Sequence, residues 1–329
     1  MTISRRELLR NAAGFASAVV LPGSLFGCSD DARDQAIRPA TEDATPPPGD
    51  TTAVPPPPAA DEARLRDWAG RVREEGLVDA DDPAGRAATR VGELAVGTPY
   101  EAFTLEKYLT AGDSPSRTEP LTLHLDRFDC VSLVESCIAV ARVAHQEGAP
   151  TWNAFAREME RMRYRGGVRE GYTSRLHYFS EWLDDNERRG LVRVLGRELG
   201  GVADTRPLRF MSTHPEAYPA LAVPAILSEI GAMERRLDDS PRFVIPTDRV
   251  VTVAEQIRTG DVLAFATSIE GLDVTHAAFA YRDEADALRV LHAPLSGGVV
   301  EVTDSTVPEY VAAIRRATGI LIARPLWGP

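Results

Sequence analysis

Long hydrophobic runs, clusters of basic residues and glycine-rich loops are all scarce in this sequence. After the first 30 residues, no segment is apolar enough to cross a bilayer. Acidic residues outnumber basic ones by 49 to 37 and no basic patch interleaved with aromatics is found, which argues against nucleic acid as a partner. There is no glycine-rich phosphate loop and no internal repeat. The chemistry must therefore be sought among a few rare residues, above all 3 cysteines and 6 histidines.

The first 28 residues have the features of an export signal. Arg5 and Arg6 form a twin-arginine pair, and a weakly apolar stretch follows over residues 12–26. This stretch is too short and too interrupted by glycine and proline for a spanning helix. It ends at Leu25-Phe26-Gly27-Cys28, which resembles a bacterial lipoprotein cleavage site with Cys28 as the lipidated residue. We expect the mature protein in the periplasm, tethered to a membrane through Cys28 or free if the signal is cleaved without lipid.

A proline-rich linker is predicted over residues 29–60, and a globular domain over residues 61–329. Residues 39–58 contain 8 of the 24 prolines, and such runs favour extended polyproline II over a packed core. From Asp61 onward the composition is that of a globular chain, and no second linker divides it.

A cysteine opens the helix that is predicted after Asp129. Apolar residues recur every three or four positions from Val131 to Ala141, the spacing of a helix with one buried face. Asp129 is a good N-cap, because its carboxylate can accept hydrogen bonds from the free N–H groups of the first turn. A thiol at this place feels the positive end of the helix dipole, which predicts a lowered pKa and a nucleophilic thiolate at Cys130.

The spacing of Cys130 and Cys137 excludes a disulfide between them. Seven residues apart on one helix, their Cα atoms would be ~10.5 Å apart, whereas a disulfide needs less than about 7 Å. Both are therefore expected to be free thiols. Cys137 belongs to the apolar face and should be buried, which leaves Cys130 as the candidate nucleophile.

Two histidines are predicted to meet on neighbouring strands near the C-terminus. The sequence predicts three strands, over residues 261–267, 275–281 and 287–293. The last two flank a polar hairpin loop, and a turn centred on Glu284 places His276 directly opposite His292. Cross-strand neighbours have Cβ atoms ~4.5–5.5 Å apart, close enough for one imidazole to orient the other.

These residues match the arrangement of an activated nucleophile for acyl transfer. Cys130 would attack a carbonyl, His276 would take the thiol proton and give it to the leaving amine, and His292 would fix the tautomer of His276. The Cys130 backbone N–H, at a helix N-terminus, is a natural donor to the oxyanion. A zinc site made of the same three side chains is the competing chemical interpretation. The sequence has no close ligand pair such as His-x-x-x-His, so we expect neither metal nor cofactor.

The order of these residues resembles a known group of enzymes, the NlpC-type papain-like cysteine peptidases. More narrowly, over residues 61–324 the chain resembles the N-acetylmuramoyl-L-alanine amidase-like family within that superfamily. The motifs that carry the resemblance are Asp129-Cys130-x-x-Leu133-Val134, Gly260-Asp261-Val262, Gly97-Thr98-Pro99-Tyr100, Thr104-Leu105-Glu106, Tyr172-x-Ser174-Arg175-Leu176-His177-Tyr178, Phe210-Met211-Ser212-x-His214-Pro215, Gly271-Leu272-Asp273-Val274-x-His276 and Leu291-His292-Ala293.

The resemblance implies an α+β, papain-like (NlpC-type) fold in which the nucleophile helix packs on an antiparallel sheet. It implies a catalytic triad of Cys130, His276 and His292. It also implies peptidoglycan fragments as substrate, with hydrolysis of the amide between N-acetylmuramic acid and L-alanine through an acyl-enzyme thioester. Two positions depart from the pattern: Ser132 follows Val131 where many relatives have Ser-Gly after the cysteine, and His124 stands where asparagine is expected.

The block around Arg175 has two interpretations. The family's matching block implies that Ser174, Arg175 and His177 line saccharide or peptide subsites. An apolar stripe over residues 176–183 predicts instead an ordinary amphipathic helix with its polar residues facing outward.

Two other functions stay open from the sequence. The first is an endopeptidase that cuts between γ-D-glutamate and the diamino acid of the stem peptide, because it needs the same triad. The second is a non-catalytic lipoprotein that binds the cell wall, although a binder has no need of an exposed thiol. Ser29 follows Cys28 in place of the aspartate that commonly retains lipoproteins on the inner membrane, so we expect an anchor on the outer membrane.

Overall fold

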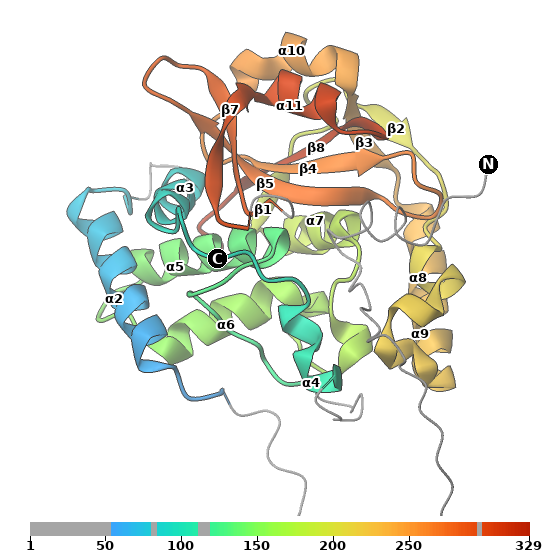
Figure 1. Ribbon diagram of the computed structural model, residues 1–329, viewed down its shortest axis with the longest axis horizontal. Coiled ribbons are helices and arrows are strands. Elements are labelled where there is room, and N and C mark those ends of the chain that lie inside the picture. Colours follow the sequence, from blue (N-terminus) through green and yellow to red (C-terminus); the bar gives the residue numbers. More distant parts are fainter. Residues whose placement is uncertain (1–53, 80–83, 111–118, 295–297) are drawn as a thin grey trace, which may run out of the picture.

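The computed structural model describes residues 54–79, 84–110, 119–294 and 298–329, and it has an α+β architecture around an antiparallel sheet (Figure 1). The predicted export signal, Cys28 and most of the predicted linker lie outside the described residues. Among the described residues, no helix combines the length and the apolar character needed to span a bilayer.

The sheet has eight strands, and every pair in it is antiparallel. Its order is β2-β3-β8-β4-β5-β6-β7, with β1 also paired to β8. The three strands predicted from the sequence are confirmed as β4, β5 and β6. The bounds are β1 Val192–Val194, β2 Val202–Asp204, β3 Arg242–Pro246, β4 Val262–Thr267, β5 Val274–Arg282, β6 Leu288–His292, β7 Glu301–Thr306 and β8 Ala317–Pro325.

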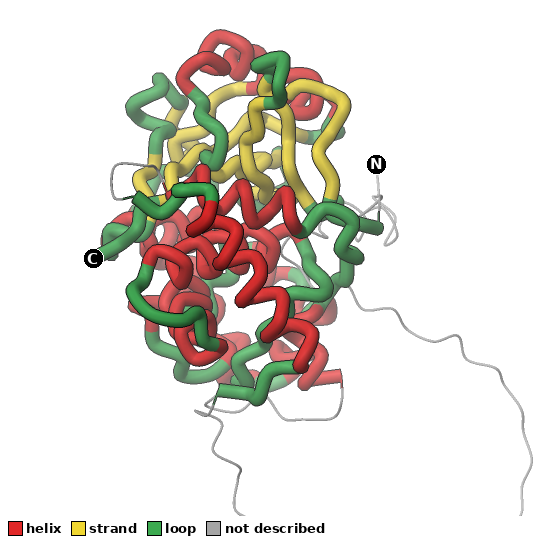
Figure 2. The backbone as a smooth tube through the Cα atoms, turned by 90° about the vertical axis from the view of Figure 1, so that its left-hand side faces the viewer, coloured by secondary structure: helices red, strands yellow, loops and turns green. Residues whose placement is uncertain are grey.

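Helices cover both faces of this sheet (Figure 2). The larger layer, below the sheet in Figure 1, includes α2, α5 and α6, and the smaller layer above it contains α10 and α11. The bounds are α2 Ala59–Glu74, α3 Ala84–Leu94, α4 Lys107–Thr110, α5 Cys130–His145, α6 Trp152–Arg163, α7 Phe179–Arg188, α8 Phe210–Thr213, α9 Pro224–Arg236, α10 Val250–Val253 and α11 Val307–Ala313.

Alternating side chains of β4 and β5 build a hydrophobic core on each face of the sheet. Ala264 and Ala277 belong to the cluster that contains Leu133 and the rest of the apolar face of α5. Phe265 and Ala278, one position further along their strands, belong to the cluster beneath α10 and α11. This is the two-residue period of a strand with both faces covered. The prediction that the nucleophile helix packs on an antiparallel sheet is therefore confirmed at the level of architecture.

The turn before β4 explains the Gly260-Asp261 motif. Gly260 has φ +91°, and a Cβ built on it would come within 2.1 Å of the Gly85 backbone in α3. Asp261 is buried, and its two carboxylate oxygens accept hydrogen bonds of 2.7 and 2.8 Å from Arg324 of β8. The glycine therefore permits a backbone contact between helix and sheet, and the aspartate joins two neighbouring strands.

The register of the β5–β6 hairpin differs from the prediction. Arg282 pairs with Leu288, so the turn is centred on Ala285 rather than on Glu284. The Asp283 carboxylate closes this five-residue loop by accepting hydrogen bonds from the backbone N–H groups of Ala285 and Ala287. As a result, His276 and His292 are diagonal neighbours instead of facing each other directly, and the predicted direct opposition is wrong.

Candidate active site

Helix α5 begins at the candidate nucleophile, as predicted. The Asp129 carboxylate accepts hydrogen bonds from the N–H groups of Val131 (3.0 Å) and Ser132 (2.7 Å), and the Ser132 hydroxyl accepts one from the Asp129 N–H (2.9 Å). This reciprocal capping box fixes the start of the helix. Cys130 and Cys137 are both buried and neither is in a disulfide, which confirms that the two are not bonded to each other.

Cys130 lies where β5 loses its β6 partner. The last pair of the β5–β6 ladder is Phe279 with Leu291, so the ladder ends before it reaches Ala277. The N–H of Ala277 donates a hydrogen bond to the Cys130 sulfur instead. The gap in the ladder thus places the thiol next to the residue that follows His276.

The two histidines form a directly bonded pair. His276 Nε2 and His292 Nδ1 are 2.7 Å apart, with the two rings edge to face at an interplanar angle of 74°. The ring of Phe265, from β4, stacks on His276 at a centroid distance of 5.6 Å. With Nε2 engaged by His292, Nδ1 is the His276 nitrogen that remains for a proton exchange with a thiol.

Two further residues, which the sequence alone did not indicate, lie beside His292. The Tyr310 hydroxyl of α11 lies 3.3 Å from His292 Nδ1, and Glu301 Oε1 of β7 lies 3.6 Å from Nε2. His292 is 1% exposed, and its Nε2 has no hydrogen-bond partner. Glu301 pairs with His292 across strands β6 and β7. The sequence could have indicated this carboxylate only if the position and register of β7 had been predicted.

Burial sets the protonation states of the site. It raises the pKa of the Cys130 thiol to about 12, with a smaller contribution from the Asp129 carboxylate, although backbone N–H groups oppose the shift. Burial lowers the pKa of His276 well below its ordinary value and that of His292 to about 4. The Cys130 thiol and the two imidazoles are therefore neutral in the resting protein at neutral pH.

The predicted low pKa of Cys130 is therefore wrong for the resting protein. The helix dipole alone would lower the pKa of this thiol, since Cys130 lies in the first turn of α5, where the dipole acts. The capping carboxylate of Asp129 offsets that positive end, and burial disfavours the thiolate more strongly than the N–H groups favour it. A nucleophilic role for this thiol would therefore require coupled proton transfer rather than a standing thiolate.

Arg175 and His177 are buried rather than lining an open face, whereas Ser174 is partly exposed. Arg175 Nη2 donates to Glu106 Oε1 at 3.0 Å, and its Nε lies 3.3 Å from Glu119 Oε1. The His177 ring packs against Tyr172, its Nε2 is 2.7 Å from the Tyr172 carbonyl oxygen, and burial lowers its pKa well below the ordinary value. These contacts account for Arg175 and His177 through internal packing alone. A role in substrate binding for Ser174, Arg175 and His177 stays a prediction.

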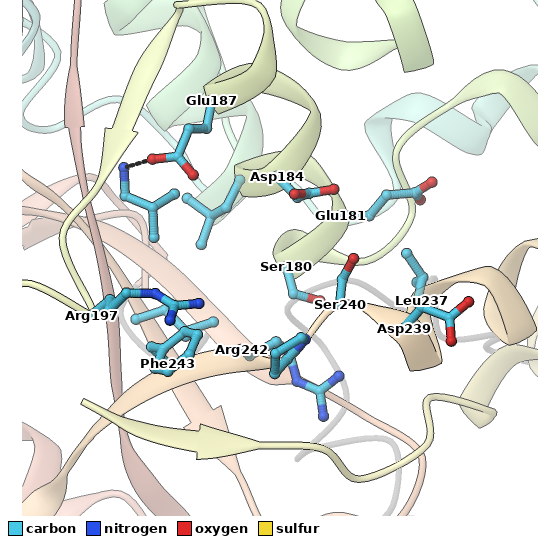
Figure 3. A pocket seen from close by; sticks show the side chains of 14 residues that line it. Ser180, Glu181, Asp184, Glu187, Arg197, Leu237, Asp239, Ser240, Arg242 and Phe243 are labelled. Atoms are coloured by element: carbon cyan, nitrogen blue, oxygen red, sulfur yellow. Dashed lines mark hydrogen bonds between the residues drawn. The ribbon is translucent and has the colours of Figure 1, made fainter.

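A cavity of about 420 Å³ lies away from this constellation, between α7 and β3 (Figure 3). Its lining mixes acidic side chains of α7, such as Glu181 and Asp184, with Arg197 and Arg242. The Arg197 guanidinium is held 4.0 Å above the Phe243 ring. None of the candidate triad residues lines this cavity, so it is separate from the thiol and the two imidazoles.

Comparison with protein-family models finds a match over more than half of the chain. Residues 90–320 match the model described as AmiA-like, N-acetylmuramoyl-L-alanine amidase-like. No curated protein sequence matches the chain.

Solved structures give further similarities. An N-acetylmuramoyl-L-alanine amidase from Bacteroides uniformis is 28% identical, with a TM-score of 0.67 over 74% of this chain and 99% of its own. A putative xylanase from Bacteroides fragilis is 33% identical, with a TM-score of 0.64 over 71% of this chain and 98% of its own. Protein LPG0564 from Legionella pneumophila, at 16% identity, 80% and 94% coverage and a TM-score of 0.57, shares the fold.

Proposed function

The chain belongs to the N-acetylmuramoyl-L-alanine amidase-like family, and on this basis we propose that it is a cysteine-dependent amidase of peptidoglycan fragments. The bond cut is the amide between N-acetylmuramic acid and L-alanine. The observation that carries the proposal is the 2.7 Å contact between His276 and His292 beside the Cys130 thiol. A xylanase would need a pair of carboxylates about the scissile bond. The groups gathered at this site are a thiol, two imidazoles, a phenol and two carboxylates, of which Asp129 caps α5 and Glu301 faces His292.

The reaction starts from the neutral Cys130–His276 pair. When the substrate carbonyl reaches the sulfur, His276 Nδ1 takes the thiol proton as the carbon–sulfur bond forms. The N–H groups of Val131 and Ser132 donate to the Asp129 carboxylate, and the Cys130 N–H, which points to the Cys130 sulfur in the resting protein, would stabilise the oxyanion. Collapse of the tetrahedral intermediate breaks the amide bond, and His276 gives its proton to the departing amine of L-alanine.

The second half-reaction releases the sugar. The lactyl group of N-acetylmuramic acid is now a thioester on Cys130. His276 takes a proton from water as the water oxygen attacks the thioester, and then returns that proton to the sulfur. His292 holds the ring plane of His276 through both steps, and Tyr310 and Glu301 hold His292. The nucleophile at a helix start beside a strand histidine supports a papain-like, NlpC-type assignment.

Product analysis tests the proposal. Muropeptide incubated with the wild-type protein should yield free sugar and the whole stem peptide, identified by mass spectrometry. The Cys130→Ala variant should yield neither, because no other group can form the thioester. The Cys137→Ala variant is the matched control, since that thiol lies in the core, and it should retain activity.

Three outcomes contradict the proposal. A dipeptide still linked to the sugar would make the protein the endopeptidase of the stem peptide. Undiminished turnover by Cys130→Ala, or inhibition by chelators but not by thiol alkylation, would favour the zinc interpretation. Binding of muropeptide without turnover would identify a wall-binding module.

We further propose that the protein is exported through its twin-arginine signal. Acyl chains on Cys28 would then hold it to the outer membrane, facing the periplasm. The proline-rich segment between Cys28 and α2 supports this arrangement, because extended polyproline spans ~3.1 Å per residue and lets a tethered domain reach its substrate.

A further inference from the structure

Three potential metal ligands meet at the start of α2, apart from the proposed triad. Asp61 lies in the first turn of α2, and His124 and Asp126 lie on the segment that leads to Asp129 and Cys130. One side-chain ligand atom from each residue lies within 4.8 Å of the other two. His124 Nδ1 and Asp126 Oδ1 are 3.9 Å apart.

Each of the three residues has a buried polar atom without a hydrogen-bond partner. These atoms are Asp61 Oδ2, His124 Nδ1 and Asp126 Oδ1. Asp61 is the most deeply buried of the three residues, with 1% of its surface exposed. A buried polar atom without a partner is destabilising, so two carboxylate oxygens and one imidazole nitrogen in this state in one place call for a ligand.

Two arginines lie beside the cluster, and neither forms a hydrogen bond with these three atoms. Arg64 donates to the other oxygen of Asp61, Oδ1, at 3.1 Å. Arg127 Nε approaches Asp126 Oδ1 at 3.0 Å without forming a hydrogen bond, while its Nη1 donates to Glu101 at 3.2 Å. Arg127 can therefore remain paired with the Glu101 carboxylate if the Asp126 carboxylate rotates to bind a metal ion.

We propose that Asp61, His124 and Asp126 bind a divalent transition-metal ion, with Zn²⁺ as the best fit. Imidazole nitrogen and carboxylate oxygen are both ligands that zinc accepts, and water would supply the fourth ligand of a tetrahedron. Bond lengths of about 2.0–2.2 Å require the three side chains to draw together from their present spacing. The ion would join the segment before Cys130 to α2.

Metal binding to the purified full-length protein tests this assignment. Zn²⁺ is measured by equilibrium dialysis and Co²⁺ by its visible absorption. We expect stoichiometric binding by the wild type and by Cys130→Ser, and a Co²⁺ spectrum without the near-ultraviolet thiolate charge-transfer band. His124→Ala and Asp126→Asn should each weaken binding by more than about tenfold, the scale on which even outer-shell changes act. Zn²⁺ should raise the melting temperature of the wild type but not of these two variants.

Asp67→Asn is the matched control, because Asp67 is an exposed carboxylate of the same helix and pairs with Arg71. It should bind metal as the wild type does. Absence of binding by the wild type would overturn the proposal and leave the cluster to ordered water. Binding that disappears in Cys130→Ser, with a thiolate band in the wild type, would also overturn it, because the metal would then sit at the triad. The proposal does not depend on the amidase assignment, since these readouts require no activity.

Discussion

Glu301 is the residue whose contribution to the proposed reaction can be isolated most cleanly. Its carboxylate lies 3.6 Å from His292 Nε2 and is 45% exposed, so it stabilises a protonated imidazole pair only through screened attraction. Glu301→Gln should lower kcat by no more than about fivefold, the equivalent of roughly 1 kcal/mol. Because the carboxylate favours the protonated pair, its removal should move the acid limb of the pH profile to lower pH.

The wild-type profile sets the reference for that shift. Burial holds the pKa of His276 well below its usual value of 6.5, so the acid limb of kcat/KM should lie below pH 6.5. Asp304→Asn removes a charge from an exposed position of β7 that does not face His292, and it should leave the limb in place. If the acid limb of Glu301→Gln is unchanged or moves to higher pH, Glu301 does not stabilise the protonated imidazole pair.

Individual residues were predicted well where local pattern governs them. The cap at Asp129, the start of α5 at Cys130 and the free thiols all follow from spacing within one helix. The pKa of Cys130 could not be predicted in this way, because it depends on burial by segments distant in sequence. Tyr100 and Tyr310 both lie close enough to feel the charge of a Cys130 thiolate, and they come from opposite ends of the domain.

Among the secondary-structure elements, the contact between α3 and the turn before β4 gives the sharpest stability prediction. An alanine at Gly260 would meet the Gly85 backbone and would also occupy a positive φ. Gly260→Ala should lower the free energy of unfolding by at least about 2 kcal/mol, measured by urea denaturation. A variant as stable as the wild type would mean that the backbones of α3 and this turn are not in close contact.

Gly70→Ala is the control for this prediction. Gly70 lies within α2, where an added Cβ has nothing within 4 Å. Alanine is more stable than glycine in the interior of a helix, so this substitution should raise the free energy of unfolding by about 0.5–1 kcal/mol. Opposite signs from the same chemical change would separate the close contact from any general effect of an added methyl group.

Strands and helices were thus easier to predict than the way they pair. Short runs rich in apolar residues identified β4, β5 and β6, because strands covered on both faces bury nearly every side chain, as β4 does. The register depended on how the Asp283 side chain closes the loop, which no periodicity reports. The diagonal placement still brought the two histidines into contact, because imidazole rings reach across such a pair.

At the scale of the whole molecule, the untested feature is the N-terminal anchor. When the full-length protein is expressed in a Gram-negative host and fractionated, it should sediment with the outer membrane. Cys28→Ser should appear in the soluble periplasmic fraction, because stable anchoring needs acyl chains that a serine cannot carry. Identical soluble behaviour of both proteins would remove Cys28 as a lipid attachment site and leave the proline-rich segment as a spacer only.

The protonated, buried state of Cys130 makes its sulfur resistant to oxidation. Peroxides and disulfides attack thiolates far faster than thiols, and oxidation beyond the sulfenic acid is in most cases irreversible. A sulfur that is 1% exposed and has a pKa of about 12 offers such oxidants almost no target. Its nearest cysteine along the helix, Cys137, is enclosed in the core and cannot act as a resolving partner. In the proposed mechanism, Cys130 is therefore protected from oxidation between turnovers and becomes vulnerable only in the step that deprotonates it.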